Sequence, residues 1–170
     1  MATRISAKSS RNASAKALAG IPVRELLRLD NQLCFALYSA SLTMTKVYKP
    51  LLKALGLTYP QYLAMLVLWE RDGVMVSELG ERLFLDSGTL TPLLKRMEAQ
   101  GLLRRERSVE DERQVLVHLT AAGAKLRPRA QEVPAQVLHA SQCTLGEIGE
   151  LTRRVQKLRG GLEQSAQAAA

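Results

Sequence analysis

The sequence contains few of the residues that build disulfide scaffolds, metal sites or aromatic cores. Its 170 residues include two cysteines, two histidines and seven aromatic side chains. Cys34 and Cys143 lie 109 residues apart, and no CxxC pair or cysteine–histidine cluster occurs. We therefore expect neither a disulfide framework nor a metal, and no cofactor. The scarcity of aromatics predicts an aliphatic core, in a composition that favours helix.

Long apolar runs are also missing. No stretch approaches the ~20 residues of a membrane span, and no secretory apolar segment follows Met1. These absences predict a cytoplasmic protein without a membrane partner, in a reducing compartment where a cysteine is either buried or reactive. Residues 1–24 contain basic but no acidic side chains, which predicts a disordered basic tail; an organelle transit peptide is the alternative.

Positive charge is what the sequence has in excess. The net charge is +8 and the pI is about 9.9. This balance suits a polyanionic partner, either nucleic acid or an anionic membrane. A merely basic soluble protein would have the same balance, so charge alone does not decide between these interpretations.

Apolar spacing predicts helices in the first part of the chain. Asp30 can cap a long helix. Pro50 is expected to break or kink that helix, which then resumes and stops at Gly56. Residues 58–61 form a capping box that opens the next helix.

The middle of the chain carries the pattern of a winged helix. Ser77 is the expected N-cap of one short helix, and Asp86 or Ser87 is the expected N-cap of another, a helix-turn-helix pattern. Two strand-like segments, 102–107 and 115–119, follow and are joined by a polar turn. A β-hairpin directly after a helix-turn-helix is a wing.

The last part of the chain is predicted to be helical again. Thr120 can cap a helix that Pro128 and Pro134 interrupt, and the capping box 144–147 opens the final helix. The apolar stripes of the terminal helices have no core of their own to cover, which predicts pairing with a second copy. The fold class is mainly α (α+β), a winged helix-turn-helix with terminal helices forming a dimerisation domain. The predicted regions are a disordered basic tail at 1–24, a helical dimerisation region at 25–57 and 121–165, and a winged helix-turn-helix DNA-binding region at 58–120.

The helix after Asp86 is the candidate recognition helix. Small hydroxyl residues in its first turn can meet phosphates and base edges, a glycine allows close approach, and two cations lie further along. The candidates are Ser87, Gly88, Thr89, Thr91, Lys95 and Arg96. A capped surface helix with solvated charges is the alternative.

The predicted wing carries charges of both signs. Arg104, Arg105 and Arg107 precede a turn that holds Asp111 and Arg113. A lone arginine at a hairpin tip suits the narrow minor groove, and Asp111 could brace Arg113. The charge pattern alone does not separate DNA contact from a solvated surface. A two-fold dimer would bind a pseudo-palindrome with half-sites about one helical turn apart.

Cys34 falls in the first turns of the long predicted helix, and helix N-termini stabilise thiolates. Tyr38 is four residues further on and shares its face, whereas Tyr48 is 14 residues on, about 21 Å along a straight helix. Spacing leaves two interpretations open. One is a small core cysteine beside tyrosines that fill an interface; the other is a reactive thiolate supported by tyrosine hydroxyls.

Five segments carry a family pattern in a fixed order. They are LDNQLCF at 29–35, YKPL at 48–51, TYPQY at 58–62, LDSGTLTPLLKRME at 85–98 and DER at 111–113. Together they resemble the OhrR group of organic-hydroperoxide sensors in the MarR family, over residues from about 28 to 125. The cysteine-bearing segment distinguishes this group from MarR proteins in general.

The resemblance implies a homodimeric repressor that binds double-stranded DNA and is not an enzyme. It implies that Cys34 reacts with organic hydroperoxides and that Cys143 is the resolving cysteine of a two-cysteine branch. Tyr38, Tyr48 and Tyr59 would surround the thiol, some from the partner subunit. The implied DNA contacts are Ser87, Gly88, Thr89, Thr91, Pro92, Lys95, Arg96, Arg105, Asp111 and Arg113. A MarR-type repressor released by a reversibly bound phenolic or anionic ligand, without redox chemistry, is the alternative.

Overall fold

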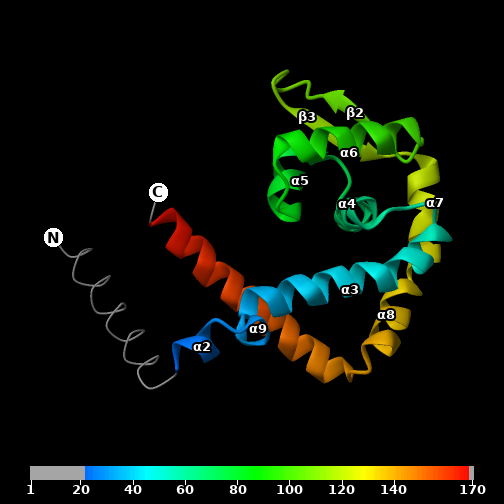
Figure 1. The fold of residues 1–170 in the computed structure, drawn as a ribbon. Coiled ribbons are helices and arrows are strands. Elements are labelled where there is room, and N and C mark those ends of the chain that lie inside the picture. The colour runs from blue at the N-terminus through cyan, green and yellow to red at the C-terminus, as the bar shows by residue number, and fades with distance from the viewer. Residues whose placement is uncertain (1–21, 169–170) are drawn as a thin grey trace. The chain divides into compact units, whose positions relative to one another are not determined.

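Residues 22–168 are described by the computed structural model drawn in Figure 1. Residues 1–21, which make up most of the predicted basic tail, lie outside the described residues. The described residues divide into two compact units, residues 22–44 and residues 45–168. The predicted division into a tail, a dimerisation region and a winged helix stays a prediction.

The first unit contains short helical segments and the beginning of a long helix. Its elements are α2 (Val23–Leu26), a 3-10 turn (Leu29–Asn31) and the first part of α3 (Leu33–Lys53). The prediction that Asp30 caps the long helix was wrong, because Asp30 lies inside the 3-10 turn. The Gln32 carbonyl instead accepts the first helical hydrogen bond, from the Ala36 N–H at 3.0 Å.

α3 passes through Pro50 and ends at Lys53, so this proline does not break the helix; the alternative expectation, a kink at Pro50, stays a prediction. A proline in the last turn removes a single N–H donor, and the remaining hydrogen bonds carry the helix past it. The predicted stop at Gly56 is confirmed. Gly56 has φ +69°, and the Leu57 N–H donates to the Leu52 carbonyl at 3.0 Å, a left-handed helix terminator.

The second unit contains a winged helix. Its elements are α4 (Tyr59–Glu70), β1 (Val74–Met75), α5 (Val76–Leu83), α6 (Ser87–Ala99), β2 (Leu103–Arg107) and β3 (Val115–Leu119). The strands form an antiparallel sheet of order β1-β3-β2. The predicted helix-turn-helix and wing are confirmed, and Figure 1 shows the hairpin of β2 and β3 next to α6. β1 was not predicted, because two residues are too few to show strand alternation.

Helices α4 and α6 begin at their predicted caps. The Thr58 N–H donates to the Gln61 side chain at 2.8 Å, one half of the predicted capping box. The Asp86 carboxylate accepts the Thr89 N–H at 2.9 Å, which confirms Asp86 as the N-cap of α6.

Ser77 does not cap α5, contrary to the prediction. Met75 occupies the N-cap position, and Val76 is already helical. The reason lies in the sheet: Met75 pairs with Leu116 on β3, so the chain passes from strand to helix without an intervening polar turn.

The chain ends in three helices. They are α7 (Ala121–Ala130), α8 (Val133–Ser141) and α9 (Leu145–Gln167). The predicted caps are confirmed: the Thr120 hydroxyl accepts the Gly123 N–H at 3.1 Å, and Thr144 forms a capping box with Glu147. The predicted interruption is a boundary between two helices, since α7 passes Pro128 and Pro134 lies in the first turn of α8.

Among the described residues, the buried apolar side chains lie between residues 52 and 133. The largest are Leu52, Met65, Leu68, Leu79, Leu90, Leu94, Met97, Leu103, Val74 and Val117. A backbone junction completes this core. The Trp69 indole donates to the Gly123 carbonyl at 3.1 Å, and a Cβ at Gly123 would lie 2.1 Å from the Leu102 carbonyl oxygen. Only glycine permits this approach of α7 to the start of β2.

Candidate DNA-binding surface and thiol site

Helix α6 has a buried face and an exposed face. Its apolar side chains, at most 3% exposed, are Leu90, Leu93, Leu94 and Met97. Its exposed residues include Ser87, Gly88, Thr89, Pro92, Lys95 and Arg96. Thr91 is half-buried at the border. The α6 residues that were predicted to contact DNA therefore lie on the exposed face of this helix or at its border.

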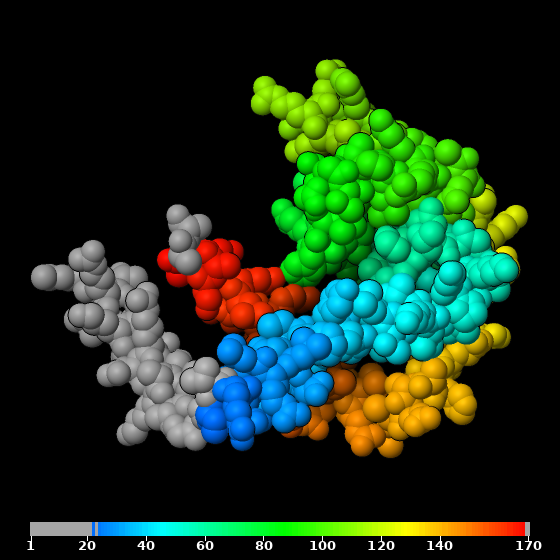
Figure 2. Space-filling model, in the orientation of Figure 1, coloured from blue at the N-terminus to red at the C-terminus, as the bar shows by residue number. Residues whose placement is uncertain are grey.

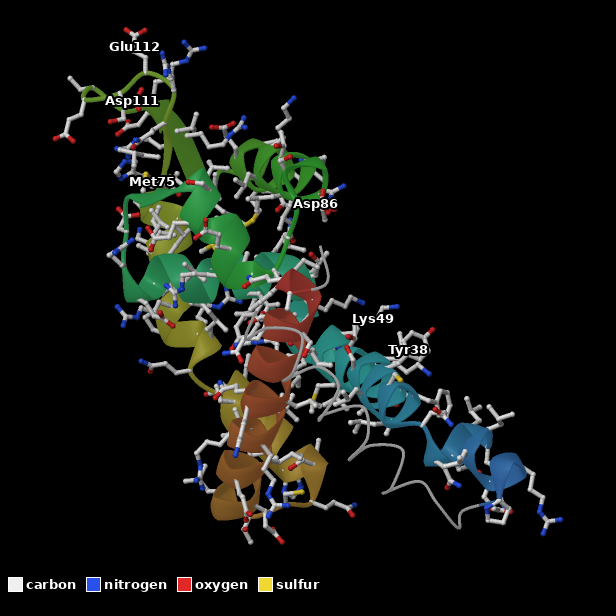
Figure 3. The ribbon with its side chains drawn as sticks, turned by 90° about the vertical axis from the view of Figure 1, so that its left-hand side faces the viewer. Tyr38, Lys49, Met75, Asp86, Asp111 and Glu112 are labelled. Carbon is white, nitrogen blue, oxygen red and sulfur yellow. The ribbon has the colours of Figure 1, made fainter. Side chains whose placement is uncertain are left out.

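The first turn of α6 is held by a carboxylate, labelled in Figure 3. Asp86 accepts hydrogen bonds from the Thr89 hydroxyl at 3.0 Å and from the Thr89 N–H at 2.9 Å. These two bonds hold the pKa of the Asp86 carboxyl below its ordinary value. A Cβ at Gly88 would stand 3.0 Å from the same carboxylate, so the glycine fits the cap. Because the Thr89 hydroxyl donates to Asp86, it must give up this bond before it can donate a hydrogen bond to DNA.

Lys95 and Arg96 carry uncommitted charge on the recognition helix. Both are exposed. Among residues 22–168 neither side chain has a salt bridge or a hydrogen bond. Each can therefore approach a phosphate without giving up another partner.

Arg105 on β2 is committed to another side chain. Its guanidinium donates to the Glu98 carboxylate from Nε at 3.0 Å and from Nη2 at 2.6 Å. The Arg105 backbone N–H donates to the same carboxylate at 2.9 Å. The side-chain bonds, and next the backbone bond, hold the pKa of the Glu98 carboxyl below its ordinary value. The side chain of Arg105 is 25% exposed and faces the recognition helix.

The hairpin projects from the body of the winged helix, as the space-filling view in Figure 2 shows. At its tip Asp111 accepts the Arg113 N–H at 3.0 Å and the Gln114 side-chain amide at 3.3 Å. Asp111, labelled in Figure 3, therefore braces the turn, which was one of the roles open to it. The Arg113 side chain is exposed and has no ion pair or hydrogen bond to any other described residue.

The base of the wing has a contact that sequence reasoning missed, between Asp72 and strand β3. His118 on β3 lies with Nε2 3.0 Å from the Glu106 carboxylate and Nδ1 3.6 Å from the Asp72 carboxylate. Asp72 also accepts the Leu119 N–H at 2.7 Å. No local pattern marks these residues, because Asp72 is far from the hairpin along the chain.

The predicted redox cysteine is accessible. Cys34 is the second residue of α3 and is exposed. Tyr38, one helical turn further on, is 60% exposed. Cys34 and Tyr38 are therefore not covered by the other described residues of the same chain, and the role of Cys34 as a reactive thiol stays a prediction.

Three tyrosines cluster in the second unit. The Tyr48 ring lies 4.7 Å from that of Tyr59 and 5.9 Å from that of Tyr62, between ring centroids. Burial raises the pKa of all three hydroxyls, and neighbouring tyrosines raise those of Tyr48 and Tyr62 further. These hydroxyls stay protonated at neutral pH and can donate hydrogen bonds. Of the tyrosines predicted to support the thiol, Tyr48 and Tyr59 contact each other, and the ring of Tyr62 lies beside that of Tyr48. Their role toward Cys34 stays a prediction.

A cavity of about 650 Å³ lies beside Tyr59 and reaches the C-terminal end of α6. Its lining is partly apolar and partly cationic, and includes Leu52, Leu57, Tyr59, Lys49, Lys53 and Arg96. Gln61, which also lines the cavity, donates to the Gln100 side chain at 2.8 Å. This bond joins the start of α4 to the C-terminal end of α6.

Cys143 lies at the junction of α8 and α9 and is half-buried. Its thiol donates to the Ser141 carbonyl at 3.4 Å, and its N–H donates to the Ser141 hydroxyl at 3.3 Å. The preceding Gln142 has φ +57°, which makes the turn between the helices. Both cysteines are free thiols.

Two further observations concern residues 22–168 alone. No group of three or more histidine, cysteine, aspartate or glutamate side chains is arranged to hold a metal ion there. In the same part of the chain, no helix combines the length and the apolar character needed to cross a membrane.

The chain is similar to several transcriptional regulators. A family model for the transcriptional regulators SarA and Rot matches residues 46–128. The organic hydroperoxide resistance transcriptional regulator of Bacillus subtilis (strain 168) is 51% identical over 138 residues, 81% of this chain and 94% of that protein. The structure of reduced AbfR bound to DNA has a TM-score of 0.71 at 35% identity, over 84% of this chain and 98% of that one. A disulfide form of AbfR has a TM-score of 0.54 at 38% identity, over 79% and 95%.

Proposed function

The chain belongs to the OhrR group of the MarR family of winged-helix transcriptional regulators, and from that membership we propose a repressor that senses organic hydroperoxides through Cys34. In the reduced state a homodimer binds a pseudo-palindromic operator, with each α6 in a major groove. The first turn of α6 approaches base edges, while Lys95 and Arg96 contact phosphates. Arg113 at the wing tip enters the minor groove.

The exposed face of α9 supports the homodimer. Leu151, Val155 and Leu162 recur along this helix and are 56%, 39% and 59% exposed. None of the residues of α9 is buried within the chain. A second copy that covers this apolar face removes it from water, and a two-fold pair is the commonest arrangement that does so.

The sensing step begins with the Cys34 thiolate. Its sulfur attacks one oxygen of the hydroperoxide, so an S–O bond forms as the O–O bond breaks. The leaving alkoxide takes a proton and departs as an alcohol, and Cys34 becomes a sulfenic acid. Tyr48 of the partner subunit is suited to donate a hydrogen bond here, because Tyr48 of the same chain is about 21 Å along the helix.

Cys143 then converts the sulfenic acid to a disulfide. Its thiolate attacks the Cys34 sulfur, an S–S bond forms, and the hydroxyl leaves as water after protonation. A disulfide requires the two Cα atoms to come within about 7 Å. Helix movement that brings the cysteines together changes the spacing of the two recognition helices and releases the operator.

One observation carries this proposal: a free, exposed thiol at the second position of α3, in a chain 51% identical to a hydroperoxide-resistance regulator. The similarity to a disulfide form of AbfR supports the second step.

The test is a gel shift with reduced protein and cumene hydroperoxide. The unaltered protein is expected to release DNA, and Cys34→Ser to keep it at every peroxide concentration. Cys143→Ser is the matched control: it is expected to form a dimedone-reactive sulfenic acid but no disulfide. A Cys34→Ser protein that still releases DNA on oxidation would refute the sensing role.

The cavity beside Tyr59 favours a second candidate function, release by a reversibly bound phenolic or anionic ligand. Its volume of about 650 Å³ suits a small ligand, and Lys49 and Lys53 can meet an anionic group. Salicylate added to Cys34→Ser protein separates the two functions. If salicylate releases the DNA, and the additional substitution Lys49→Gln weakens that release, the ligand-binding function is supported. If salicylate leaves DNA binding unchanged, the ligand-binding function is excluded.

A further inference from the structure

Among residues 22–168, one salt bridge joins the wing to the recognition helix, that of Arg105 with Glu98. We propose that Glu98 and Arg105 are positioning residues for DNA recognition, which fix the wing to α6, and that Arg105 does not itself contact DNA. This proposal revises the predicted role of Arg105 as a wing contact. It rests on DNA binding by the winged helix and is independent of the chemistry at Cys34.

The geometry of the pair fixes a backbone as well as a side chain. Glu98 accepts the Arg105 guanidinium at 3.0 and 2.6 Å and the Arg105 N–H at 2.9 Å. The backbone bond holds strand β2 at a set distance from α6. The two guanidinium bonds fix the orientation of the Arg105 side chain relative to Glu98, because a pair of bonds to one carboxylate allows little rotation. A lysine could supply the charge but not this fork.

Strand alternation explains why Arg105 faces inward. Leu103, Arg105 and Arg107 lie on one face of β2, and Leu103 at the start of that face is only 1% exposed. Arg107 at the far end is exposed, and it has no ion pair or side-chain hydrogen bond with any residue from 22 to 168. Of the two arginines on this face, Arg105 is therefore the one whose side chain contacts α6.

If Arg105 positions the wing, its loss should change the affinity for DNA but not the salt dependence of binding. An arginine that contacts phosphate releases counterions, and its removal lowers the slope of log affinity against log salt by about one. Arg105 already neutralises Glu98 in the free protein, so its loss should leave that slope unchanged. Its loss should still weaken binding, because the wing tip carrying Arg113 is no longer held at the angle that meets the minor groove.

Glu98 gives a test in which two explanations predict opposite signs. If charge alone mattered, Glu98→Gln would remove a negative charge near phosphate and strengthen DNA binding. If the pair positions the wing, Glu98→Gln weakens binding by about fivefold, the upper range for a partly exposed charge pair. Reduced full-length protein is titrated with operator DNA over a series of salt concentrations.

The matched variants complete the experiment. Arg105→Gln and Arg105→Lys are both expected to bind about fivefold more weakly with an unchanged salt slope. The double variant Glu98→Gln/Arg105→Gln should be no weaker than Arg105→Gln alone, because the pair acts as a unit. Arg107→Gln, on the same face of β2, provides the comparison for loss of an unpaired wing cation.

Two results would overturn the proposal. One is a Glu98→Gln protein that binds DNA as tightly as the unaltered protein or more tightly. The other is an Arg105→Gln protein whose salt slope falls by about one, as expected for a lost phosphate contact. If Arg105→Gln is poorly folded, Arg105→Lys decides: unaltered affinity means that charge, not position, is what Arg105 supplies.

Discussion

The winged helix and the last helix of the chain use the same apolar periodicity with opposite results. In α6, four apolar side chains are at most 3% exposed, because α4, α5 and the sheet cover them. In α9, Leu151 and Leu162 occupy equivalent stripe positions and are 56% and 59% exposed. An apolar stripe therefore identifies a face that must be covered, but not the element or the molecule that covers it.

The difference assigns different sources of stability to the two regions. The winged helix buries its core within one chain and should fold as an intact unit at any protein concentration. In the proposed homodimer a second copy covers the apolar face of α9, so the stability of this helix should depend on protein concentration.

The largest effect is expected in the winged-helix core. Leu68→Ala on α4 empties a site that is 1% exposed and should lower the free energy of unfolding by about 2–5 kcal/mol. Leu66→Ala, two residues away on the same helix and 36% exposed, is the matched control and should cost about 1 kcal/mol or less. Urea unfolding at one fixed protein concentration measures both. Equal losses would mean that α4 has no distinct buried face.

A charge on the stripe of α9 should act on association instead. Leu151→Glu is expected to weaken self-association by about tenfold to a hundredfold, since burying one such side chain contributes about 1.5–3 kcal/mol. Thr152→Glu places the same charge one residue off the stripe and should leave the dimer intact. Sedimentation equilibrium gives the dissociation constants, and circular dichroism checks that both variants stay helical. A Leu151→Glu protein that dimerises normally would contradict the proposed interface.

The smallest effect concerns the caps that begin α6 and α9. Hydrogen bonds from Thr89 hold the pKa of Asp86 below its ordinary value of 3.8, and bonds from Thr144 hold that of Glu147 below 4.5. Each cap is therefore fully present above the ordinary value and is lost as the pH falls through the lower folded-state value.

Two isosteric variants isolate this dependence. Asp86→Asn and Glu147→Gln keep a capping side chain but remove its titration. Each should be less stable than the unaltered protein at neutral pH, because the ionised carboxylate accepts the stronger hydrogen bonds, and should lose stability less steeply in acid, as followed by circular dichroism between about pH 5 and 2. An acid transition identical to that of the unaltered protein, in both variants, would show that these carboxylates do not contribute to it.

Local signals in the sequence predicted most of the fold. The caps at Asp86, Thr120 and Thr144 and the stop at Gly56 are each set by residues within a few positions of one another, so they can be recognised from the sequence. One prediction that failed depends on a contact between residues that are far apart in the sequence. Ser77 was expected to cap α5, but pairing with a distant strand placed the helix start earlier.

The candidate site divides in the same way. The spacing of apolar residues identified the exposed residues of α6, because the residues between the buried apolar ones must lie on the opposite face of the helix. Spacing could not show that Arg105 is bonded to Glu98, since both residues appear in the sequence as solvated charges. The roles of Cys34 and Cys143 stay predictions, because they depend on an assembly of two chains.

The backbone junction at Gly123 has a mechanical consequence. The carbonyl of Gly123 is held by the Trp69 indole, and its Cα lies against the Leu102 carbonyl with no side chain between them. A shift at the N-terminal end of α7 should therefore displace the Leu102 carbonyl, which directly precedes strand β2 of the hairpin.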